Sequence, residues 1–151
     1  AHPDRSALLF KGGEPADMDW LAGLGAPGGD RRLLVLNVCS GGQSTMWNSP
    51  YGFGIAPLLA GPSQTVISHL WPTVPAIAAA FGVLLAQALS EGDDHERAFA
   101  RTVGTLADGS DRVLGALRSA PEKGCRLAEH IAGSSLDLAN IAHWGSPTLH
   151  I

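Results

Sequence analysis

The sequence predicts an α/β fold with a mainly parallel sheet, because short apolar runs alternate with longer segments of helical periodicity. Residues 33–39 form a continuous apolar run, and residues 64–70 are rich in Val, Ile and Thr. Helical patterns follow each of these runs. The chain has 151 residues and is 45% hydrophobic, which fits one domain with one core.

The first elements are predicted from breaks in the apolar pattern. Residues 6–10 predict a strand that ends at a Gly-Gly pair, and residues 16–24 predict a helix that Gly25 ends. The run 33–39 is apolar at almost every position, which is typical of a strand buried on both faces. We therefore expect it at the centre of the sheet.

The later elements are predicted to be mostly helical. A helix is expected near 54–60 with Gly61-Pro62 as its stop, then a strand at 64–70 and a buried helix at 74–90. Acidic residues at 91–96 are expected to cap a helix start. An amphipathic helical region follows, with apolar residues at helical spacing: Ala98, Val103, Leu106, Val113, Leu114 and Leu117. The chain is expected to end in an extended piece at 144–151.

Charge and hydropathy exclude several classes of function. The net charge is −4 and no basic cluster is interleaved with aromatic residues, so a nucleic-acid partner is not expected. The uncharged stretch 74–90 is shorter than a bilayer crossing needs, and no leader peptide is recognisable, which predicts a cytoplasmic protein without a membrane partner.

The histidines lack HxxxH or HExxH spacing, and Gly42-Gln43-Ser44-Thr45 lacks the lysine of a phosphate-binding loop. We therefore expect neither metal nor cofactor.

Cys39 is the candidate nucleophile. It ends the apolar run 33–39 and is followed by Ser40, Gly41 and Gly42, which places a thiol at the carboxyl end of a strand, where open α/β sheets keep their chemistry. Amide N–H groups of this loop can stabilise a thiolate and an oxyanion. The alternative is a buried structural thiol.

The other cysteine, Cys125, follows no strand and is interpreted as incidental. Two cysteines that lie far apart in the sequence indicate a reducing compartment.

Four stretches together resemble the CHAT domain, a caspase-like group of cysteine peptidases. Residues 2–10 resemble its Pro-x-x-Ser-x-Leu strand, and residues 33–42 resemble the strand that ends in its Ser-Ala-Cys-x-Thr-Gly motif. Residues 58–72 resemble the run from its "aGa" turn to its "SLW" strand, and residues 143–151 resemble its closing Trp-Ala-x-Phe strand. The order and spacing of the four stretches carry the resemblance.

The resemblance implies a caspase-like three-layer α/β/α sandwich, of which residues 1–151 form the carboxy-terminal portion without the amino-terminal strands. The resemblance also implies that Cys39 is the nucleophile. The family's catalytic histidine lies in a His-Gly pair that would fall upstream of Ala1, and His2 is a weak substitute because no glycine follows it. Asn37-Val38 replaces the usual Ser-Ala, and Gly41 replaces the usual Thr.

His69 and Trp71 are the candidate pocket residues. If neighbouring strands end level, His69 lies close to Cys39 and either lines a specificity pocket or acts as a substitute base. The alternative is a structural, partly buried histidine bonded to backbone. Trp71 is expected to pack beneath the pocket.

Two functions follow from these observations. One is a cysteine endopeptidase that acts on a protein or peptide, with the missing strands and the histidine base supplied by a further domain or chain. The other is a catalytically degenerate CHAT module that binds proteins in a signalling or defence assembly.

Overall fold

The fold is known from a computed structural model, which describes residues 7–9, 15–17, 31–36, 55–138 and 140–151. The chain divides into two compact units. The sheet unit comprises Ala1–Trp71 and Thr148–Ile151, and the helical unit comprises Pro72–Pro147. The protein is α/β with a mixed sheet of three strands, so the predicted class is confirmed at this level.

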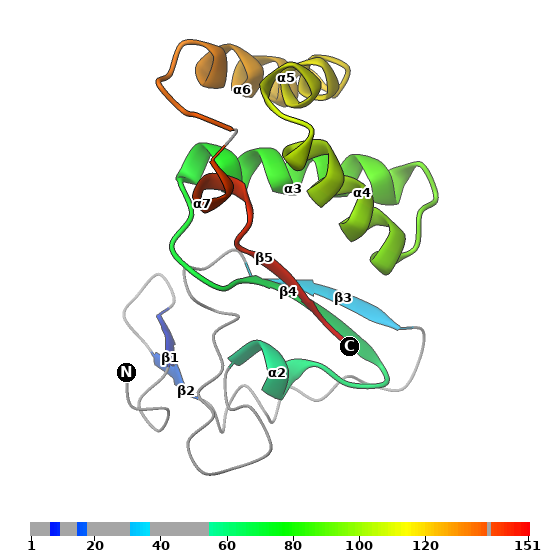
Figure 1. Cartoon of the computed structure of the whole chain (residues 1–151). Helices are drawn as coiled ribbons and strands as arrows, with labels where there is room; N and C mark the ends of the chain where they lie inside the picture. Colours follow the sequence, from blue (N-terminus) through cyan, green and yellow to red (C-terminus); the bar gives the residue numbers. More distant parts are fainter. Residues whose placement is uncertain (1–6, 10–14, 18–30, 37–54, 139) are drawn as a thin grey trace. The chain divides into compact units, whose positions relative to one another are not determined.

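Strand β4 (Gln64–His69) is the middle strand of that sheet, in the order β3-β4-β5 (Figure 1). Five of its six residues are buried, which its β-branched side chains favour. β3 (Arg32–Val35) runs parallel to it, with pairs from Arg32↔Gln64 to Val35↔Ile67. β5 (Pro147–His150) lies on the other side.

The predicted central position of the apolar run 33–39 is wrong for the residues that the structure describes. β3 lies at the edge of the three strands, and Val35 is 40% exposed. An apolar sequence records burial of the side chains and does not by itself say whether a strand has one neighbour or two. The strand predicted at 64–70 is confirmed over Gln64–His69 and takes the central place instead.

One face of the sheet packs on helix α2 (Ile55–Leu59), close to the predicted 54–60. The core between the sheet and α2 contains Leu36, Ala56 and Val66. Leu34, Leu59 and Ala60 pack around them. Gly61 and Gln64 exchange two backbone hydrogen bonds of 2.9 Å, forming a turn around Pro62 that stops the helix as predicted.

A separate antiparallel pair comes first in the chain. β1 (Ala7–Leu9) pairs with β2 (Pro15–Asp17), from Ala7↔Asp17 to Leu9↔Pro15. The strand predicted at 6–10 is confirmed over its described residues. The helix predicted at 16–24 is wrong at its first two residues, because strand pairing with β1 outweighs the helical spacing there; the remainder lies outside the described residues.

The helical unit contains α3 (Pro75–Ser90), α4 (His95–Ala107), α5 (Ser110–Arg118), α6 (Glu122–Ala132) and α7 (Ile141–Trp144). α3 contacts each of the other four, and the rings of Phe81 and Phe99 meet edge to face with centroids 6.2 Å apart. Trp144 ends α7, so the extended piece predicted to start there begins at Pro147. Of the predicted apolar positions, Ala98, Leu106, Val113 and Leu117 are fully buried.

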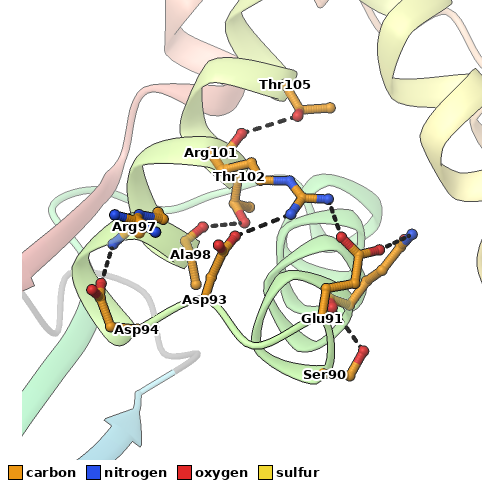
Figure 2. Close-up of polar contacts among 10 residues, drawn as sticks. Ser90, Glu91, Asp93, Asp94, Arg97, Ala98, Arg101, Thr102 and Thr105 are labelled. Atoms are coloured by element: carbon orange, nitrogen blue, oxygen red, sulfur yellow. Dashed lines mark hydrogen bonds and ion pairs between the residues drawn. The ribbon is translucent and has the colours of Figure 1, made fainter.

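Figure 2 shows how the acidic residues between α3 and α4 are used. Asp94 caps α4 as predicted, since its Oδ1 accepts a hydrogen bond of 2.8 Å from the Arg97 N–H. Asp93 and Glu91 do not cap the helix start. They pair with the guanidinium of Arg101, whose Nη1 lies 3.0 Å from Asp93 Oδ2, and the hydrogen bond from Arg101 lowers the pKa of Glu91.

Gly124 of α6 permits the close approach of α5 to α6, and its replacement by alanine should destabilise the helical unit. An added Cβ would lie 2.6 Å from both the Leu117 carbonyl oxygen and the Ala120 Cβ. Such overpacking typically costs about 1 to 3 kcal/mol. Chemical denaturation followed by circular dichroism should show this loss for Gly124→Ala.

Gly115 of α5 provides the matched control, because a Cβ added there would have no other atom within 4 Å. Gly115→Ala should raise the free energy of unfolding by about 0.5 to 1 kcal/mol through helix propensity. Equal effects of the two substitutions would contradict the close approach at Gly124.

Candidate functional site

The carboxyl ends of β3 and β4 are the part of the sheet nearest in sequence to the predicted site. The two strands are parallel and paired without offset, and the Leu36 N–H donates a hydrogen bond of 2.8 Å to the Ile67 carbonyl oxygen. Carboxyl ends of parallel strands meet at one edge of a sheet. Within the described residues β3 ends at Val35, opposite Ile67, whereas β4 continues to His69. The expectation that the two strands end level stays a prediction, because residues 37–54 lie outside the described residues.

The predicted nucleophile and its loop follow this edge in sequence but are not placed. Cys39, Ser40, Gly41, Gly42 and His2 all lie outside the described residues. Their roles stay predictions. His69, at the end of β4, and Trp71, two residues later, are described.

His69 is a buried residue. The residue is 3% exposed, and burial lowers the pKa of its imidazole because the charged form loses its hydration. Successive residues of a strand face opposite sides, so His69 shares a face with Thr65 and Ile67 rather than with Val66, which packs on α2. The imidazole of His69 thus lies buried at the end of β4, where solvent does not reach it freely.

Trp71 lies just beyond β4, in a bend, and is half-buried. It therefore belongs to the chain that leaves the sheet rather than to the paired strand. The Thr65 hydroxyl, two strand positions before Ile67 on the face of His69, is buried and has no hydrogen-bond partner in the described part of the chain.

A contact between β4 and β5 was not predicted from the sequence. The Oγ of Ser68 lies 3.3 Å from Nε2 of His150, although the residues are 82 positions apart. Ser68 is fully buried and His150 is half-buried, and burial lowers the pKa of His150. Only the pairing of the last strand with β4 brings them together, so no local signal could have revealed the contact.

The described residues hold no group of three or more potential metal ligands. Cys125 is a free, half-buried thiol of α6, with its Sγ 3.4 Å from the Arg118 carbonyl oxygen. Among the helices that the structure describes, none combines the length and the apolar character that crossing a membrane requires.

No protein-family model matches this chain, and neither the curated proteins nor the solved structures contain a significant match.

Burial of His69 should make folding stability depend on pH. An unfolded histidine has a pKa of about 6.5, and the folded pKa of His69 is lower. The unfolded chain therefore binds its proton more readily, so stability is complete above about pH 6.5 and is lost as the pH falls below it. Urea unfolding at about pH 7.5 and about pH 5 should show this loss, and it should be smaller in His69→Gln.

The exposed His130 of α6 serves as the control. His130→Gln should retain the pH dependence of the unmodified chain. An undiminished pH dependence in His69→Gln would show that the buried imidazole does not contribute to it.

Proposed function

We propose that this chain carries the nucleophile portion of a CHAT-like cysteine endopeptidase with Cys39 as its nucleophile. The observation that supports the proposal most directly is the parallel pairing of β3 with β4 without offset. Cys39 follows Leu36 by three residues in the chain. The strand that leads to the thiol and the strand that carries His69 thus run toward the same edge.

The proposed chemistry begins with the thiolate of Cys39. It attacks the carbonyl carbon of the scissile peptide bond, and amide N–H groups of residues 40–42 stabilise the oxyanion that forms. A histidine then donates a proton to the leaving amine as the C–N bond breaks, which leaves a thioester on Cys39. Water, deprotonated by the same histidine, hydrolyses the thioester and restores the thiol.

The histidine in this scheme is proposed to come from a segment that precedes Ala1 or from another chain, as the CHAT resemblance implies. The burial of His69 supports this choice over a local base, since a general base has to reach the reacting proton at hydrogen-bond distance. A caspase-like three-layer sandwich, completed by further strands, is the architecture that goes with this proposal. The α/β class and the parallel β3-β4 pair are consistent with it.

The second candidate is a catalytically degenerate CHAT module that binds protein partners without cleaving them. The same burial of His69 supports it, because a buried imidazole has little access to a thiol that it would have to activate. A free cysteine is only a few per cent thiolate at about pH 7, so such a module would be a poor peptidase.

A peptide with an electrophilic ketone warhead separates the two candidates. In a chain that includes the residues preceding Ala1, the peptidase proposal predicts labelling of Cys39 at neutral pH, at least about tenfold faster than labelling of Cys125. Peptide mapping by mass spectrometry identifies the labelled thiol. Cys39→Ser should abolish the labelling, because it removes the nucleophile.

Cys125→Ser is the matched control, since it removes the other thiol of the chain and should leave labelling unchanged. Labelling of both thiols at the same rate, or of neither, would contradict the peptidase proposal and favour the binding module.

A further inference from the structure

We draw no further inference here: the strongest candidate, the stripe of small exposed residues Pro75, Ala79, Ala86 and Ser90 along one face of the uncharged helix α3, carries nothing because the described part of the chain does not show what covers it.

Discussion

The parallel pairing of β3 with β4 is the constraint on which the sheet unit depends. Its register places Leu34 beside Val66 and brings Leu36 to the same face, where both pack with Ala56 of α2. A shift of one residue would turn these side chains to the opposite face and expose them. The same register directs the carboxyl ends of both strands toward one edge of the sheet.

Burial of β4 has a second effect, which is chemical. The strand carries Thr65, Ser68 and His69 into the interior, although none of them is apolar. Such residues have to find partners or stay neutral, since a buried charge or an unpaired hydroxyl is costly. Ser68 meets His150, and burial lowers the pKa of His69.

The helical unit shows a different balance of forces. Its core is formed by fully buried apolar side chains such as Ile77, Leu106 and Val113, whereas the turn between α3 and α4 is fixed by polar contacts. Arg101 bridges Glu91 and Asp93, and Asp94 caps α4 (Figure 2). Apolar burial supplies most of the stability of such helices. Side-chain caps mark the start of α4 and α7, whereas α3, α5 and α6 begin without one.

The sequence by itself determined the elements whose signals are local. The β-branched run at β4, the apolar stretch of α3 and the Gly61-Pro62 stop predicted their structures because propensity and turn chemistry act over a few residues. Tertiary structure decided which strand is central, that Ala16 and Asp17 pair as a strand, and that His150 meets Ser68. These depend on partners distant in sequence, and a pattern within one segment carries no information about its neighbours. The role of Cys39 is predicted from its local context alone.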